Sequence, residues 1–292
     1  MIGQMETRRI ATSYLTPQEP PDYVETGVEK VLAELAFGPN LILKGAKGVG
    51  KTLCIEVYAA RNGIPLLRYP CTDETGVRDL LGTAGLENGA NGANTYFQLG
   101  ALPAAVEVAN DEGACILVLE EINTLSPQVQ KILNPMTDYR QAVELPKIGK
   151  VFRVEPGKRI WILGTMNPNY TGTYSLNEDL RSRFQFIEMA YMARDQEKEV
   201  LLKQFQTQPT ATERELVSSL ITLAHETRSG QLGYALSTRD LVDVIRILDK
   251  VKPLARALKL LEGKFDPDKV ADIRARVQST FKVNLNDVKL YG

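Results

Sequence analysis

One Gly-rich stretch indicates the fold of this chain more clearly than any other: Gly45-Ala46-Lys47-Gly48-Val49-Gly50-Lys51-Thr52. They follow directly on an apolar run at 41–44 and lead into a helical pattern that starts with Leu53. Strand, Gly-rich loop and helix in this order form the context in which the pattern G-x-x-x-x-G-K-[ST] binds a nucleotide. The glycines let backbone N–H groups turn toward phosphates, and the helix start adds positive potential. We therefore predict a nucleotide-binding loop at residues 45–53.

Two side chains of this loop have distinct predicted roles. Lys51 reaches the outer phosphates, and the Thr52 hydroxyl ligates Mg²⁺. An alternative is a Gly-rich turn that only joins a strand to a helix, and the complete order of strand, loop and helix favours the nucleotide site. The other predicted nucleotide contacts are Gly45, Ala46, Lys47, Gly48, Val49, Gly50 and Leu53.

The distribution of apolar runs predicts an α/β fold followed by a helical domain. Short apolar runs separated by helical patterns are typical of a buried parallel sheet, with its ligand at the carboxyl ends of the strands. The predicted strands are 41–44, 65–69, 116–119 and 160–164, with 184–189 as a further candidate. The pattern then becomes helical, with predicted helices at 197–205, 213–227, 238–248, 254–261 and 269–281.

These patterns predict two domains. The first covers residues 1–191, with an N-terminal segment at 1–21, and a helical lid covers 192–292. Turn residues and alternating apolar positions predict hairpin inserts near 82–101 and 141–158. An apolar repeat at 24–35 predicts a helix after the N-terminal segment, with Asp22 and Glu25 at the spacing of a capping box.

The composition excludes a strong global field. The 35 Lys and Arg residues nearly balance the 36 Asp and Glu residues, so any nucleic-acid binding would have to be local. The three cysteines have no metal-ligand spacing, and we interpret them as small core residues in a reducing compartment. No apolar run approaches the length of a membrane span or of a signal sequence, which predicts a cytoplasmic protein.

A second motif places two like charges side by side. The stretch Cys115-Ile-Leu-Val-Leu-Glu-Glu-Ile-Asn123 is apolar until Glu120 and Glu121. Two adjacent carboxylates repel each other, which costs free energy unless a nearby cation offsets the repulsion or the pair has a catalytic role. If this strand ends beside the loop, Glu120 lies on the metal side and Glu121 takes a proton from the attacking water. The alternative is a pair of surface acids that cap a strand.

Together, these motifs resemble those of the AAA+ ATPases, and within them the MoxR-type branch. The segments that carry the resemblance span most of the chain: 45–52, 117–123, 164–168, 180–184 and 236–241. The resemblance implies a P-loop parallel sheet sandwiched by helices, hairpin inserts and an all-α lid. One departure concerns the acidic pair, because the family usually has Asp where this chain has Glu120.

The resemblance also implies roles for polar residues after the second motif. Asn167 is the expected sensor beside the terminal phosphate, with an Asx-type turn before Pro168 as the alternative. Arg183 is the expected arginine finger for a neighbouring subunit. Arg181 either shares that task or forms an ion pair with Glu178.

One further arginine lies in the predicted lid. Ser237 has the position of a helix N-cap, which puts Arg239 in the first turn, where a cation is mildly unfavourable. The resemblance implies that Arg239 contacts the phosphates, and a solvated arginine is the alternative.

The expected function is therefore a Mg-ATP-dependent motor that remodels or activates a client protein. The resemblance implies a homo-oligomer, a hexameric ring, and a von Willebrand factor A-domain partner, often in metalloenzyme maturation. One alternative is a DNA- or RNA-handling motor that uses a basic set in the second insert, and the other is an ATP-gated scaffold with little hydrolysis. The basic set comprises Lys147, Lys150, Arg153, Lys158 and Arg159.

Overall fold

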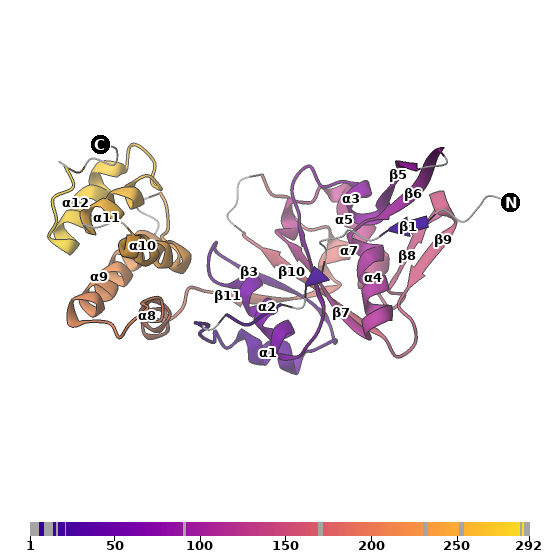
Figure 1. Ribbon diagram of the computed structural model, residues 1–292, viewed down its shortest axis with the longest axis horizontal. Helices are drawn as coiled ribbons and strands as arrows, with labels where there is room; N and C mark the ends of the chain where they lie inside the picture. The colour runs from indigo at the N-terminus through magenta and orange to yellow at the C-terminus, as the bar shows by residue number, and fades with distance from the viewer. Residues whose placement is uncertain are drawn as a thin grey trace. The chain divides into compact units, whose positions relative to one another are not determined.

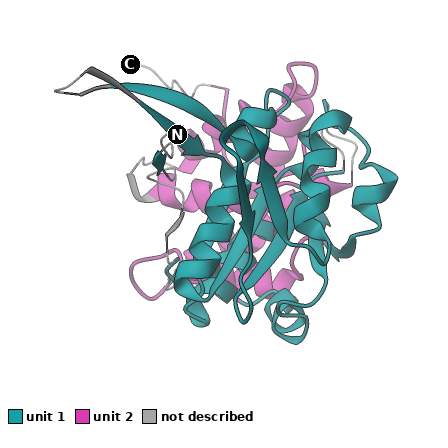
Figure 2. Ribbon diagram, turned by 90° about the vertical axis from the view of Figure 1, so that its right-hand side faces the viewer, with its two compact units in different colours: residues 1–20, 25–46, 50–189 teal, residues 21–24, 47–49, 190–292 magenta. Residues whose placement is uncertain are grey.

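The chain forms two compact units, which Figure 2 shows in different colours. Unit 1 comprises Met1–Pro20, Glu25–Ala46 and Gly50–Met189, and unit 2 comprises Pro21–Val24, Lys47–Val49 and Ala190–Gly292. Each unit has its own hydrophobic core. The computed structural model describes residues 6–8, 14–15, 17–20, 22–89, 92–168, 172–229, 233–250, 254–286 and 288.

Unit 1 contains a six-stranded sheet in the order β11-β3-β10-β7-β4-β2. Figure 1 labels β11, β3, β10 and β7 of this sheet. All strands except β2 run parallel, so the predicted parallel sheet is confirmed, including the fifth candidate run. The edge strand β2, which pairs antiparallel with β4, was not predicted. The bounds are β2 Tyr14–Leu15, β3 Asn40–Gly45, β4 Leu66–Pro70, β7 Ala114–Glu120, β10 Arg159–Met166 and β11 Phe184–Met189.

The strand order brings distant sequence motifs to one edge. Strand β10 lies between β3 and β7, and parallel strands end on the same side of a sheet. The ends of the loop strand and of the acidic strand are therefore separated by one strand, whose own end leads to Asn167. The interior residues of these strands are fully buried, which fixes the register that places their polar ends.

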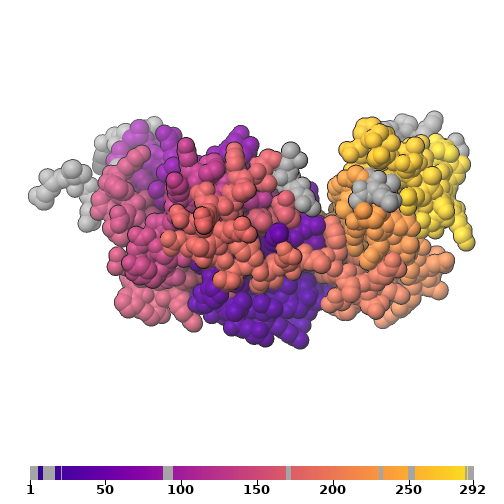
Figure 3. Space-filling model, turned by 180° about the vertical axis from the view of Figure 1, so that it is seen from behind, coloured from indigo at the N-terminus to yellow at the C-terminus, as the bar shows by residue number. Residues whose placement is uncertain are grey.

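Helices cover this sheet, and one of them is almost entirely buried. Helix α4 (Ala101–Glu112) is rich in alanine, and small side chains let a helix approach its neighbours closely. The indigo surface in Figure 3 belongs to the N-terminal part of the chain, which includes helices α1 and α2. The other helices of unit 1 are α1 Val28–Glu34, α2 Lys51–Arg61, α3 Val77–Leu81, α5 Pro127–Gln130, α6 Asn134–Thr137 and α7 Glu178–Arg181, with 3₁₀ turns at Ile122–Thr124, Lys131–Leu133 and Pro146–Ile148.

Both predicted hairpin inserts are present. In the first, β5 (Gly82–Gly89) pairs with β6 (Gly92–Leu99), and the N-terminal strand β1 (Glu6–Arg8) adds to β6 in parallel. In the second, β8 (Ala142–Leu145) pairs with β9 (Lys150–Arg153). Gly149 turns this hairpin with a φ of 62°, a conformation that glycine adopts without the strain of a side chain.

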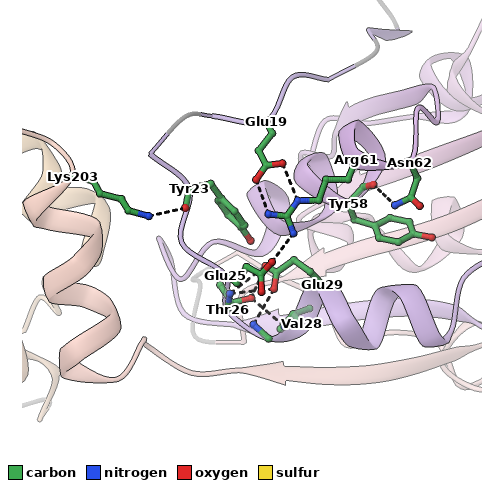
Figure 4. A network of polar contacts seen from close by, with 11 residues as sticks. Glu19, Tyr23, Glu25, Thr26, Val28, Glu29, Tyr58, Arg61, Asn62 and Lys203 are labelled. Atoms are coloured by element: carbon green, nitrogen blue, oxygen red, sulfur yellow. Dashed lines mark hydrogen bonds and ion pairs between the residues drawn. The ribbon is translucent and has the colours of Figure 1, made fainter.

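The helix predicted at 24–35 begins later than its sequence pattern indicates, and its predicted cap is wrong. Helix α1 begins at Val28, and the Glu29 carboxylate accepts hydrogen bonds from the Thr26 backbone N–H at 3.1 Å and from the Thr26 hydroxyl at 2.8 Å. Glu25 instead pairs with Arg61 at 2.7 Å, as Figure 4 shows. Arg61 also binds Glu19 at 2.6 Å, so two ion pairs tie this segment to the end of α2.

Unit 2 contains five described helices around a second apolar core. Their positions confirm the five predicted helices to within a few residues. A capping box fixes the start of α9, where Thr210 and Glu213 bond reciprocally. The helices of this part, called the helical unit (Ala190–Gly292), are α8 Arg194–Leu202, α9 Ala211–Arg228, α10 Thr238–Lys250, α11 Leu254–Glu262 and α12 Val270–Phe281.

The cysteines lie in the core of unit 1, as predicted. All three are free and buried, and burial raises the pKa of the Cys115 thiol to about 12. Thiols of this kind are unreactive at neutral pH. Among the described residues, no group of three or more His, Cys, Asp or Glu side chains could hold a metal ion. None of the helices in the described part of the chain combines the length and the apolar character that a membrane span needs.

Candidate nucleotide-binding site

The predicted nucleotide loop connects β3 to α2. Helix α2 starts at Lys51, directly after Gly50, which adopts a φ of 93°. The Lys51 ammonium donates to the backbone carbonyls of Gly45 and Ala46 at 2.8 and 2.7 Å, so this cation closes over its own loop. Gly45 has no room for a side chain, because a Cβ there would lie 2.2 Å from the Met189 carbonyl oxygen.

Glu120 is bonded directly to this loop's helix. The Thr52 hydroxyl donates to Glu120 Oε1 at 2.7 Å, although 68 residues separate the two in the chain. Hydroxyl and carboxylate oxygens are ligands that Mg²⁺ prefers. The two side chains thus fit the predicted ion, and the longer carboxylate of Glu120 still reaches the loop.

Arg68 is a site residue that the sequence analysis missed. It lies on β4 and donates to Glu120 Oε2 at 3.2 Å and to Glu56 Oε1 at 2.6 Å. The guanidinium therefore partly neutralises Glu120 on the side away from Thr52. One signal was available in the sequence: Arg68 is a charged residue within the apolar run 65–69.

Glu121 differs from Glu120 in exposure and in backbone conformation, because Glu120 ends the strand half-buried and Glu121 follows it exposed. Its φ of 52° lies in the left-handed region, which costs a residue with a side chain about 1 kcal/mol. The Glu121 N–H donates to the Thr165 hydroxyl on β10 at 3.2 Å, and the residue is exposed. Non-glycine residues in such strained conformations cluster at functional sites.

Asn167 follows β10 between the loop and the acidic strand. It is half-buried, and its backbone carbonyl accepts a hydrogen bond from Asn123 Nδ2 at 3.0 Å. Asn123 is 3% exposed, and its side-chain oxygen has no hydrogen-bond partner among the described residues. The acidic motif is therefore tied to the predicted sensor by a residue for which no role was predicted.

The two candidate finger arginines have different surroundings. Arg183 lies 3.3 Å from the Asp138 carboxylate, and its Nε is buried without an acceptor in the described part of the chain. Asp138 also pairs with Arg140 at 2.6 Å, and this contact holds the pKa of the Asp138 carboxyl below its ordinary value. Arg181 is exposed, and across the described ranges it forms no ion pair with Glu178, the alternative raised by the sequence.

Arg239 lies in the helical unit. The predicted N-cap is confirmed, because Ser237 Oγ accepts from the Asp240 N–H at 3.3 Å and α10 starts at the next residue, Thr238. Arg239 is exposed in the first turn of this helix.

The predicted basic set in the second insert is not a uniform patch, because Arg159 lies over the ring of Phe37 at 4.6 Å.

Comparison with known proteins matches residues 40–184 to the AAA domain of the dynein-related subfamily. The matched segment runs from β3 to the start of β11 and so includes the loop, the acidic pair, Asn167 and both finger candidates.

Several bacterial proteins are similar to the chain over most of its length, and all three described next are uncharacterized. An uncharacterized protein of Staphylococcus haemolyticus is 31% identical over 221 residues, which cover 75% of this chain and 81% of that protein. One from Staphylococcus epidermidis is 30% identical, with 80% and 87% covered. YojN of Bacillus subtilis is 29% identical, with 80% and 75% covered.

Among solved structures, a crystal structure of a protein from Cytophaga hutchinsonii, described as an ATPase by inference, aligns with a TM-score of 0.46 and 18% identity. It covers 84% of this chain and 78% of that one.

Proposed function

This chain belongs to the AAA+ ATPases, in one family with its staphylococcal relatives, and from that premise we propose that it is a Mg-ATP-dependent motor that remodels, activates or assembles a partner protein. The observation that carries the proposal is the 2.7 Å hydrogen bond between Thr52 and Glu120. It joins the nucleotide loop to the acidic strand where phosphoryl-transfer enzymes hold their metal ion.

Each residue at the sheet edge has a task in the proposed reaction. Lys51 exchanges the loop carbonyls that it now binds for the outer phosphates of ATP. Thr52 and Glu120 would hold Mg²⁺, and this ion would neutralise charge on the phosphates. Glu121, which is exposed, accepts a proton from the attacking water. Asn167 orients that water with a neutral amide.

The proposed reaction also needs a second copy of the chain. An arginine finger stabilises charge that develops in the transition state and is often supplied by a neighbouring molecule. Arg183 fits by its place before β11, and its pairing with Asp138 keeps the guanidinium in a defined position. Arg181 fits by its exposure. We propose a homo-oligomer, in the form of a hexameric ring, in which one or both complete the neighbour's site.

The partner is proposed from motif resemblance. The segments 45–52, 117–123, 164–168, 180–184 and 236–241 support the MoxR-type branch, and with it a client protein and a von Willebrand factor A-domain partner in metalloenzyme maturation.

Among the alternatives, the ATP-gated scaffold has one observation in its favour: Arg68 lies 3.2 Å from Glu120, where a fixed cation competes with Mg²⁺. The nucleic-acid motor has less support, since the net charge is −1 and Arg159 packs on Phe37.

The decisive experiment replaces the proposed base. We expect Glu121→Gln to bind ATP with the affinity of the unmodified protein but to release phosphate about 100-fold more slowly, because a neutral amide cannot accept the proton. Glu112→Gln is the matched control, since Glu112 is an exposed glutamate at the far end of α4. Steady-state phosphate release and binding of a fluorescent ATP analogue are measured on both. Unchanged turnover in Glu121→Gln would exclude Glu121 as the base, and ATP binding without turnover in the unmodified protein would favour the scaffold.

A further inference from the structure

Arg239 extends from a helical turn whose other polar side chains are buried. Ser237, Thr238 and Asp240 are 5–6% exposed, whereas Arg239 is exposed. In the part of the chain that the structure describes, Arg239 makes no hydrogen bond or ion pair. Its backbone is thus anchored on both sides while its cation is free to bind an anion.

Asp240 anchors one side of this turn. Its carboxylate accepts hydrogen bonds from the Ser237 N–H at 2.8 Å and from the Ser237 hydroxyl at 2.7 Å. Lys264 forms an ion pair with the same carboxylate, and the Tyr234 hydroxyl donates to it at 3.2 Å. Burial alone would raise the pKa of Asp240, but the hydrogen bonds from Lys264 and Ser237 outweigh it, so this pKa lies below its ordinary value.

Glu197 anchors the other side from a different helix. It belongs to α8, is fully buried, and accepts a hydrogen bond from the Thr238 hydroxyl at 2.7 Å. Arg228, at the end of α9, donates to both Glu197 carboxylate oxygens at 2.6 and 2.9 Å. Arg228 also donates to the Leu236 carbonyl at 2.8 Å and lies over the Tyr191 ring at 4.0 Å. One carboxylate therefore links three helices at the residue that precedes Arg239.

Stability alone is a weak reason for such a cluster. Desolvating two charges offsets much of their attraction, and apolar side chains of similar volume often stabilise a core equally well. A buried polar network instead specifies one arrangement, because any other leaves a charge unpaired. The helix dipole is also unfavourable for Arg239, so the turn does not hold this cation by itself.

We propose that Glu197 is a positioning residue for Arg239: acting through Thr238, it fixes the guanidinium at the start of α10 in the position from which Arg239 binds the phosphates of ATP. The inference rests on the proposed function, and it takes for Arg239 the role that the motif resemblance implies, which is contact with those phosphates. A loss of the Glu197–Thr238 hydrogen bond then lets the first turn of α10 fray, and Arg239 spends less time in the position that binds phosphate.

The test is a double-mutant cycle between Thr238 and Arg239. Glu197→Gln would leave Arg228 buried without its carboxylate and endanger folding, so the change is made in Thr238→Val, which keeps the side-chain shape. Thr238→Ser keeps the hydroxyl and serves as the rescue variant. Thr222→Val is the control, because the Thr222 hydroxyl bonds only its own helix at the Ser218 carbonyl. The affinity for a fluorescent ATP analogue and the melting temperature are measured for each single variant and for Thr238→Val combined with Arg239→Ala.

We expect Thr238→Val to weaken ATP binding about fivefold. In the Arg239→Ala background the same change should leave the affinity for ATP unaltered, because the effects of mutations at coupled residues do not add. Thr238→Ser and Thr222→Val should bind ATP normally. An equal loss in both backgrounds, or a lower melting temperature with normal affinity, overturns the positioning role while Arg239 keeps its own. If Arg239→Ala alone binds and hydrolyses ATP normally, the role proposed for Arg239 is wrong and the inference falls with it.

Discussion

The sheet edge of unit 1 and the first turn of α10 orient charged side chains in opposite ways. At the sheet edge, the core is apolar and the charges of Lys51, Glu120 and Glu121 stand at its boundary. Among the described residues of the helical unit, three carboxylates are buried: Glu197 is 0%, Glu262 is 4% and Asp240 is 5% exposed. Parallel strands share one edge, so apolar packing alone aligns their ends. A group of helices has no such common edge, so orienting one cation there takes buried polar contacts.

The first prediction tests whether the site at the sheet edge needs a residue from a neighbouring subunit. Arg183→Ala and Glu121→Gln should each lower phosphate release about 100-fold or more, since one removes a finger and the other a base. When the two inactive variants are mixed and allowed to exchange subunits, activity should return, because sites with an intact base meet neighbours with an intact finger. Phosphate release is measured against protein concentration.

Arg181→Ala, tested in the same mixture, separates the two finger candidates. Mixtures that stay inactive, although both variants assemble, would show that Arg183 acts within its own chain.

The two regions should also differ in how much stability is lost when a carboxylate loses its arginine partner. Arg228→Ala leaves the fully buried Glu197 without its ion pair, and we expect a loss of about 3–5 kcal/mol in the free energy of unfolding. Arg68→Ala removes a half-exposed partner of Glu120, and we expect about 0–1 kcal/mol. Chemical denaturation followed by circular dichroism measures both. Equal losses would contradict the distinction between a buried and a boundary carboxylate.

The smallest expected effect concerns pH. His225, the only histidine of the chain, lies on α9, where burial and the positive charges of Arg194 and Arg228 lower its pKa despite the nearby Glu197 carboxylate. The folded state therefore binds this proton less readily than the unfolded state, so the stabilising contribution is complete above about pH 6.5 and is lost as the pH falls through the folded pKa.

An NMR titration of the single imidazole should give a value below 6.5, and His225→Gln should flatten the stability profile in this range. A pKa at or above 6.5 would contradict the expectation.

The outcome of the sequence predictions depends on how far each relied on distant contacts. The five parallel strands and the five helices of the helical unit are recognisable because their periodicity is a local property. The start of α1 was predicted wrongly, since Arg61 draws Glu25 and Glu19 into ion pairs across 36 and 42 residues. Arg68 was missed for the same reason, because its contact with Glu120 spans 52 residues.

The α/β class, the nucleotide loop ending in Lys51-Thr52 and the acidic pair could be predicted from the sequence, because spacing and composition within a few residues specify them. The folded chain was needed to show that Glu120 meets Thr52 and that Glu197 supports the residue beside Arg239. Those arrangements depend on strand register and helix packing, which place side chains through contacts between residues far apart in the chain.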